Sequence, residues 1–199
     1  MRVIAGKFRS RRLQTLRGTA LRPSSDRLRE TLFNILGPAI EGAIFLDLFA
    51  GSGAVGIEAL SRGAWGAVFV ENHAAGAALI SRNLASLDIP VAAHVAGRKA
   101  FSGSAEILRL DAMDALRRLA ESGARVDFVF ADPPYANARA YEEVLAFLGE
   151  SEVLARSGRV IAEHRRKSVL PALAGHLERI RIVEQGDTAL TFYSPVFAA

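Results

Sequence analysis

The sequence has 199 residues, half of them hydrophobic, with a formal net charge of +4 and no cysteine. This length can bury the core of one full domain, and the lack of cysteine excludes disulfides, thiolate metal sites and thiol nucleophiles. Because no apolar stretch approaches the roughly 20 residues of a membrane span and the N-terminus lacks the apolar region of a secretory signal, we expect a soluble cytoplasmic protein with no membrane partner and no bound metal.

The positive charge is concentrated at the N-terminus: residues 1–30 carry a net charge of +7 and the remaining residues −3. Residues 1–22 contain only short β-like pieces, so we predict a basic arm or small hairpin that orders fully on its partner, with the folded domain in residues 23–199. The alternative to a polyanion partner is a solvated tail, but Arg binds two phosphate oxygens at once. The residues expected to contact nucleic acid are Arg2, Lys7, Arg9, Arg11, Arg12, Arg22 and Arg27.

A first helix is predicted to begin around Pro23-Ser24-Ser25-Asp26, where a hydroxyl cap and an acid in the first turn are typical of a helix start, and to end at Gly37-Pro38. From residue 43 onward, strands and helices alternate. The predicted strands are 43–48, 66–71, 107–110, 126–131 and 159–163, and the predicted helices are 54–61, 74–87, 113–121 and 139–148.

The C-terminal part changes character, because two short strands, 179–184 and 188–193, are joined by the hairpin signal Gln185-Gly186-Asp187. Residues 91–95 are ambiguous and could form a strand, and 97–104 a surface loop. We therefore predict an α/β fold with a doubly wound, mostly parallel sheet of seven strands, a C-terminal antiparallel hairpin and a basic N-terminal extension.

Four of the predicted strands end in an acidic residue. In doubly wound sheets, ligands bind beyond the carboxyl ends of the strands, near the point where the strand order reverses. One such acid is commonly a helix cap, but several like charges that converge on one crevice repel each other, and a cationic or hydroxyl-rich ligand would relieve that repulsion. The four acids are Asp47, Glu71, Asp111 and Asp132.

The turn after the first strand contains the pattern G-x-G-x-x-G at Gly51, Gly53 and Gly56, which by itself is a weak indicator of any nucleotide. Glu71 follows Gly53 by 18 residues, where it can accept both hydroxyls of a ribose. A dinucleotide and S-adenosylmethionine both fit this pattern. Asp47 would repel a pyrophosphate and attract the ammonium group or the surroundings of the sulfonium, so the sequence favours S-adenosylmethionine.

The third strand end is predicted to hold the adenine ring. Asp111 can accept a hydrogen bond from its amino group, and Met113 can cover its face. Together with their neighbours, these residues form the predicted cofactor site: Asp47, Phe49, Gly51, Gly53, Glu71, Asn72, Asp111, Ala112, Met113 and Asp132.

The segment Asp132-Pro133-Pro134-Tyr135 follows the apolar run 126–131 and is the most informative stretch of the chain. The prolines lack N–H donors and fix φ, so the backbone is rigid while its carbonyls remain available as acceptors. Asp132 adds a carboxylate, and Tyr135 offers a flat face for stacking. Acceptors beside a stacking surface suit a planar substrate with an exocyclic amine, although a Pro-rich turn capped by Asp is the structural alternative.

With these motifs, the chain resembles class I methyltransferases, and more narrowly the RsmD-type family of 16S ribosomal RNA guanine-N2 methyltransferases. The most specific segment is 22–34, while 47–53 is similar to the family's cofactor loop, 132–135 to its catalytic turn and 186–193 to its closing hairpin. The chain departs from the pattern in the stretch 91–105, which is about ten residues longer than the pattern needs. The His94 and Lys99 side chains in that stretch are expected at the surface.

The resemblance implies transfer of a methyl group from S-adenosylmethionine to the N2 amine of a guanine in small-subunit ribosomal RNA. It assigns the catalytic turn to Asp132, Pro133, Pro134 and Tyr135, with the Asp132 carboxylate and the Pro133 carbonyl holding the amine. Tyr135 would stack on the extruded base. The implied partner is an assembled or partly assembled 30S particle, and a monomer is expected.

Four other readings use parts of the same pattern. A DNA amino-methyltransferase shares the turn but usually carries a sizeable target-recognition domain, for which the residues after the hairpin leave no room. A protein glutamine methyltransferase prefers Asn at the position of Asp132. An NAD oxidoreductase has no use for the 132–135 turn, and a non-catalytic RNA-binding or assembly factor would not need intact acids at the strand ends.

Overall fold

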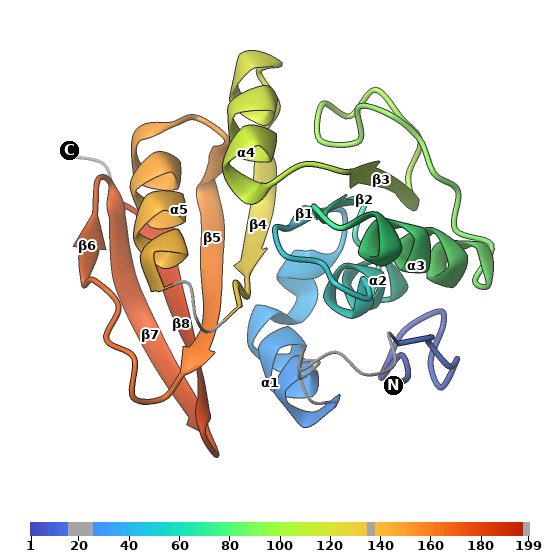
Figure 1. Cartoon of the computed structure of the whole chain (residues 1–199), viewed down its shortest axis with the longest axis horizontal. Helices are drawn as coiled ribbons and strands as arrows, with labels where there is room; N and C mark the ends of the chain where they lie inside the picture. Colours follow the sequence, from blue (N-terminus) through green and yellow to red (C-terminus); the bar gives the residue numbers. More distant parts are fainter. Residues whose placement is uncertain (16–25, 135–137, 197–199) are drawn as a thin grey trace.

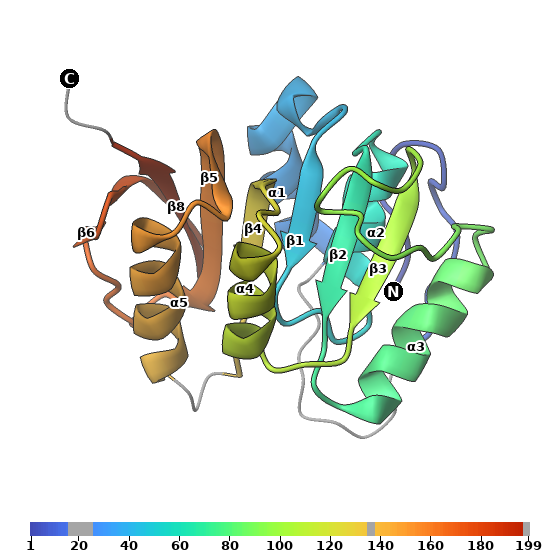
Figure 2. The same ribbon diagram turned by 90° about the horizontal axis from the view of Figure 1, so that it is seen from above.

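An eight-stranded sheet runs through the computed structural model, which describes residues 1–15, 26–134 and 138–196. The strand order is β3-β2-β1-β4-β5-β8-β7-β6, as Figures 1 and 2 show. The elements are α1 (Asp26–Leu36), the 3-10 helix η1 (Gly37–Ile40), β1 (Ile44–Asp47), α2 (Ala54–Ser61), β2 (Gly66–Val70), α3 (Ala74–Ala85), β3 (Ser104–Leu108), α4 (Ala112–Glu121), β4 (Val126–Ala131), α5 (Ala138–Glu150), β5 (Leu154–Arg165), β6 (Leu173–Ala174), β7 (Leu177–Gln185) and β8 (Thr188–Pro195).

The first five strands of this order are parallel, and β8, β7 and β6 pair in antiparallel fashion. The predicted doubly wound α/β fold and C-terminal antiparallel hairpin are confirmed, but the described sheet has eight strands and not seven. The additional strand is β6, which turns back into β7 through Gly175 at φ +56° and pairs Ala174 with Leu177. A two-residue strand is too short to leave a periodic signal in the sequence.

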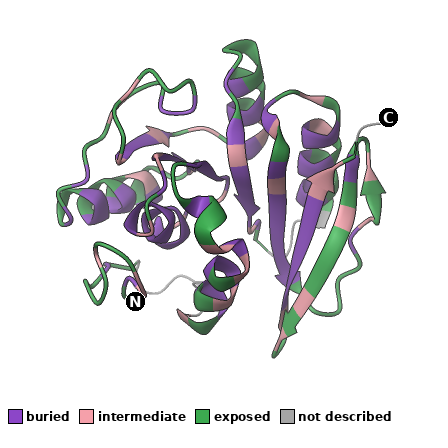
Figure 3. Cartoon of the chain, turned by 180° about the vertical axis from the view of Figure 1, so that it is seen from behind, coloured by how far each residue is buried: buried purple, intermediate pink, exposed green. Residues whose placement is uncertain are grey.

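Helices cover both faces of the parallel part of the sheet, so β1, β2 and β4 are largely buried, whereas β7 near the antiparallel edge is largely exposed (Figure 3). One face packs against α4 and α5 in a cluster that includes Leu46, Val68 and Val129. On the other face, α1 packs against Phe45, and α2 shares a cluster with α3 and β2. Figure 2 shows α4 and α5 in front of the strands and α1 and α2 behind them.

Most predicted elements are present, and α2 and β4 have the predicted bounds. The ambiguous stretch 91–95 forms only one isolated bridge, from Val91 to Ala105, while β3 begins earlier than predicted, at Ser104. His94 and Arg98 take φ values of 60° and 53°, which interrupt an extended strand. The His94 and Lys99 side chains are exposed as expected.

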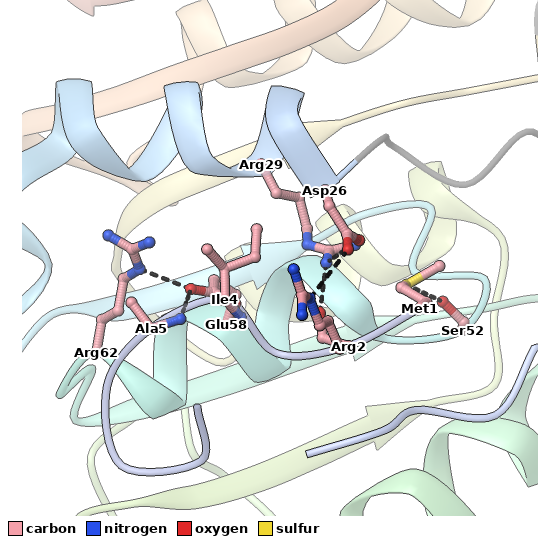
Figure 4. A network of polar contacts seen from close by, with 9 residues as sticks. All are labelled: Met1, Arg2, Ile4, Ala5, Asp26, Arg29, Ser52, Glu58 and Arg62. Atoms are coloured by element: carbon pink, nitrogen blue, oxygen red, sulfur yellow. Dashed lines mark hydrogen bonds and ion pairs between the residues drawn. The ribbon is translucent and has the colours of Figure 1, made fainter. Parts of the chain in front are cut away.

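Residues 1–15, called the N-terminal segment below, pack on α2 and α3, so the described part of the predicted arm is already ordered against the domain. A bridge joins Arg2 to Arg12, and Val3 and Leu13 are buried. The fully buried Glu58 carboxylate of α2 accepts hydrogen bonds from the backbone of Ile4 (2.7 Å) and Ala5 (3.0 Å) and from Arg62 Nε (2.7 Å), as Figure 4 shows. The remainder of the predicted arm, 16–22, lies outside the described residues.

No helix in the described part of the chain is long and apolar enough to cross a membrane.

Candidate functional site

A cavity of about 750 Å³ opens beyond the carboxyl ends of β1, β2, β3 and β4, where the strand order reverses. Its wall combines apolar side chains with a few carboxylates, which is typical of a ligand site. It is lined by Leu48, Phe49, Gly51, Val70, Glu71, Asn72, His73, Ala75, Gly76, Leu110, Asp111, Ala112, Met113, Arg117, Asp132, Pro134, Ala140, Glu143 and Val144.

The structure brings most of the predicted cofactor residues together in this wall: Phe49, Gly51, Glu71, Asn72, Asp111, Ala112, Met113 and Asp132. These residues come from four separate turns of the chain, each of which follows a parallel strand. The wall is therefore built by the topology of the sheet, and it brings together three of the four strand-end acids, Glu71, Asp111 and Asp132.

The Glu71 carboxylate is fixed by two backbone donors: Gly51 N–H donates to Oε2 at 2.9 Å and His73 N–H to Oε1 at 2.8 Å. Each oxygen keeps further acceptor capacity for two adjacent hydroxyl groups. Gly76 of α3 makes room for this arrangement, because a Cβ there would lie 2.7 Å from the Glu71 carboxyl carbon. The carboxylate thus occupies a place that a side chain at 76 would fill.

Asp111 has two roles in the structure. Its Oδ1 caps α4 by accepting from Asp114 N–H at 2.9 Å, which is the structural alternative weighed above. Its side chain is nevertheless exposed and lines the cavity, with Met113 half-buried beside it. The second carboxylate oxygen of Asp111 therefore remains available as an acceptor toward the cavity.

Asp47 lies beneath the glycine loop and not in the wall of the cavity. It is 1% exposed, and its Oδ2 accepts from Gly56 N–H at 3.1 Å, which fixes the start of α2. Burial raises the pKa of Asp47 to about 7; the Gly56 N–H opposes this, and Glu71 and Glu163 add repulsion. The structure therefore gives Asp47 no direct access to a ligand in the cavity.

The other two glycines of the motif have structural roles as well. Gly53, at φ +77°, caps α2 in a left-handed conformation and does not line the cavity. A Cβ on Gly56 would lie 2.4 Å from the Phe69 ring, so this glycine permits the close packing of α2 on β2. Of the motif's glycines, only Gly51 reaches the wall.

Asp132 and Pro134 line the cavity, and Pro133 is buried beside them. Burial raises the pKa of Asp132 well above its usual range, with further repulsion from Glu163 and Asp47. On β5, Ala162 pairs with Ala131 of β4. Glu163 and Asp132 are the next residues of the two strands, so they lie side by side. Tyr135 lies outside the described residues.

Several wall residues carry no motif and were not predicted. Arg117 and Glu143 are the charged ones, and each pairs with a neighbour on its own helix, Asp114 at 2.9 Å and Arg139 at 2.8 Å. Arg117 is four residues after Met113, so the same-face spacing of α4 could have indicated it. The α5 residues had no such signal.

The residues expected to contact nucleic acid are on the surface where they are described. The side chains of Arg2, Lys7, Arg9, Arg11, Arg12 and Arg27 are exposed, and Arg22 lies outside the described residues. Arg2 is 3.7 Å from Asp26, and Arg11 donates to the Ser86 carbonyl at 2.6 Å. The N-terminal segment distributes these charges along α2. Met1 contacts Ser52 of the glycine loop, before the start of the helix, and Lys7 contacts Ser61 at its end.

Comparisons with known proteins agree with this geometry. The family model "Conserved hypothetical protein 95" matches residues 1–194. The chain is 35% identical over 193 residues to "Putative rRNA methyltransferase YlbH" of Bacillus subtilis, covering 97% of this chain and 98% of that protein. It is also 35% identical over 193 residues to "Ribosomal RNA small subunit methyltransferase D" of Escherichia coli K12, covering 97% and 89% of the two chains.

The fold is shared as well. The solved structure of "Putative methyltransferase yhhF" from Escherichia coli superimposes with a TM-score of 0.80 at 35% identity, covering 98% of this chain and 97% of the other. The match of fold, family model and sequence spans nearly the entire chain. The chain therefore belongs to the Conserved hypothetical protein 95 family, which is the RsmD family that its motifs resemble.

Proposed function

We propose that the protein transfers a methyl group from S-adenosylmethionine to the exocyclic N2 amine of a guanine in small-subunit ribosomal RNA. The observation that carries this proposal is that the Asp132-Pro133-Pro134 turn opens onto the same cavity as Glu71 and Asp111. Relatives at 35% identity are named as ribosomal RNA methyltransferases, which supports an RNA substrate. The NAD reading loses support, because the wall carries the carboxylates of Glu71, Asp111 and Asp132, which would repel a pyrophosphate.

The wall of the cavity fits S-adenosylmethionine. The fixed Glu71 carboxylate would accept the two ribose hydroxyls, Asp111 and Met113 would hold the adenine, and the Gly51 backbone would pass beside the amino-acid part. Once bound, this cofactor supplies a methyl group on a sulfonium and leaves as a neutral thioether. Asp47 would contribute through its charge beneath the loop and not through contact.

The turn would position the nucleophile. The N2 lone pair of guanine is delocalised into the ring, so the amine reacts only when it is held in a favourable orientation. The Asp132 carboxylate and the Pro133 carbonyl would each accept one N–H, and the two prolines keep these acceptors rigid. The Asp132 carboxylate or a water molecule would then take the proton that the methylated amine releases. Tyr135 is proposed to stack on the base, at about 1–3 kcal/mol.

The experiment offers radiolabelled S-adenosylmethionine to small subunits from a strain that lacks the enzyme, with the labelled base identified by mass. We expect label on guanine N2 with the wild type and none with Asp132→Ala, while S-adenosylhomocysteine still raises the Tm of the variant. Glu142→Gln, at an exposed site on α5 away from the cavity wall, serves as the matched control and should keep full activity. Label on adenine, or full activity of Asp132→Ala, would contradict the proposal.

A further inference from the structure

Three consecutive basic residues, Arg165-Arg166-Lys167, lie at the carboxyl end of β5, and all three side chains are exposed. Because β5 is parallel to β4 with Ala162 opposite Ala131, Arg165 lies three residues beyond the end of β4. At the rise of a strand, Arg165 is about 7 Å beyond the level of Asp132, where the catalytic turn begins. The basic run therefore begins beyond Asp132 on the neighbouring strand, outside the cavity wall and on the side away from the N-terminal segment.

The backbone of this run is fixed at several points. The buried His164 donates from Nδ1 to the Arg165 carbonyl at 2.8 Å, since a carbonyl only accepts. Arg166 N–H donates to the Asp187 carbonyl at 2.8 Å, and Ser168 N–H to the Arg165 carbonyl at 2.8 Å. The side chains are therefore presented from an ordered backbone, which lowers the entropic cost of binding a partner.

The charges of Arg166 and Lys167 are not balanced by an ion pair within the part of the chain that the structure describes. Elsewhere, Arg98, Arg117, Arg125 and Arg139 each pair with an acidic side chain. Residues 31–199 carry a net charge of −3, whereas this run holds three consecutive basic residues.

We propose that Arg166 and Lys167 bind backbone phosphates of the RNA next to the nucleotide that enters the cavity. The inference rests on the proposed function, and it adds a second contact surface to the N-terminal segment. In Figure 1, the N-terminal segment and the carboxyl end of β5 lie toward opposite ends of the long axis, with α1 between them. An RNA strand whose base enters beside Asp132 must pass its flanking phosphates along this rim, where a pair of unpaired cations attracts them.

An acidic protein surface is the other occupant that this charge could attract. RNA is favoured because the run lies on the strand next to the turn that would receive the base, and the phosphates that flank this base are the nearest part of the substrate. The two partners can be distinguished with RNA from which the proteins have been removed. Contacts to phosphates persist on this RNA, whereas contacts to a protein are lost.

The experiment compares the wild type with Arg166→Ala/Lys167→Ala on deproteinised 16S RNA and on 30S subunits from the deficient strain. On the deproteinised RNA, loss of two phosphate contacts should reduce the slope of log affinity against log salt by about 1.4 to 1.8. On subunits, KM should rise with kcat and cofactor affinity unchanged. The matched control is Arg82→Ala/Arg118→Ala, which removes two exposed charges from the last turns of α3 and α4.

An unchanged salt slope on deproteinised RNA would overturn the inference, whether or not binding to subunits falls, and a fall on subunits alone would indicate a protein partner. A control variant that loses as much slope as the test variant would also overturn it. If the wild type binds RNA with the expected slope but labels no base, the proposed function fails and the phosphate surface survives. Circular dichroism of each variant establishes that the fold is retained.

Discussion

Among the described residues, the buried carboxyl group of Asp47 accepts one hydrogen bond, from the backbone N–H of Gly56, so the cost of burying its charge is offset only in part. Its pKa of about 7 in the folded protein lies well above 3.8, the value for an exposed Asp. Between these two values the folded state binds more protons than the unfolded state. The free energy of unfolding therefore falls as pH rises through this window and levels off above it.

The pH dependence of stability tests this assignment. In the wild type, Asp47 should lower the free energy of unfolding by up to about 1.4 kcal/mol per pH unit between roughly pH 4 and pH 7. Asp47→Asn keeps an oxygen for Gly56 and carries no charge, so its urea-unfolding curve should depend less on pH and gain most over the wild type at pH 8. Equal pH slopes in the two proteins would mean that Asp47 titrates as an exposed acid does.

Gly76 is a positioning residue for Glu71. Alanine in the middle of a helix normally stabilises a protein by about 0.5–1 kcal/mol relative to glycine, but a Cβ here would meet the Glu71 side chain at 2.7 Å. Gly76→Ala should therefore displace the carboxylate, so that S-adenosylhomocysteine raises the Tm less than in the wild type while the Tm of the free protein holds. Gly97→Ala, where the nearest atom is 3.7 Å away, is the control. If S-adenosylhomocysteine raises the Tm of Gly76→Ala as much as that of the wild type, Gly76 does not position Glu71.

At the scale of elements, Asn83 of α3 joins three parts of the chain. Its buried side-chain amide donates to the carbonyls of Ser52 (2.9 Å) and Gln14 (3.1 Å), and its Oδ1 accepts from Gln14 N–H at 2.8 Å. The N-terminal segment, the glycine loop and α3 therefore meet at one side chain. Since Gly51 of that loop bonds to Glu71, the order of the segment is linked to the cofactor wall.

Asn83→Asp tests this link with little change of shape, because a carboxylate cannot donate to the two carbonyls. We expect a loss of about 1–3 kcal/mol in the free energy of unfolding, faster hydrogen exchange in residues 1–15 and weaker binding of S-adenosylhomocysteine. Asn34→Asp, at an exposed position on α1, should change none of these. Exchange that stays slow in residues 1–15 would show that Val3, Leu13 and Glu58 hold the segment without Asn83.

The elements that sequence alone could predict are those with strong local signals. The bounds of α2 and β4 follow from a glycine turn and an apolar run, and the acids at the strand ends indicated the right edge of the sheet. What failed depends on tertiary context: β6 is two residues long, and the isolated bridge of Val91 needs β3 as its partner. The burial of Asp47 likewise depends on how α2 packs, which its motif does not reveal.

At the scale of the whole molecule, the N-terminal segment is part of the folded unit as well as a candidate RNA surface. Deleting it would leave the buried Glu58 carboxylate with Arg62 as its one remaining partner in Figure 4, so a truncation would confound stability with binding. Substitution of exposed side chains avoids this problem. Arg2 and Arg12 lie near the glycine loop, through Met1 and Ser52, whereas Lys7 and Arg9 lie near Ser61 at the other end of α2.

This placement predicts that position, and not charge alone, decides the contribution of each basic residue. Arg2→Ala/Arg12→Ala should reduce the salt slope of RNA binding by about 1.4 to 1.8, and Lys7→Ala/Arg9→Ala, the matched pair in the same segment, should reduce it less. Arg2 and Arg12 share no partner with Arg166 and Lys167. In a variant with all four residues changed to Ala, the two effects should therefore add, and the salt slope should fall by about 3. If Lys7→Ala/Arg9→Ala reduces the salt slope as much as Arg2→Ala/Arg12→Ala does, the segment attracts RNA through its net charge alone. The position of Arg2 and Arg12 near the glycine loop then makes no separate contribution to binding.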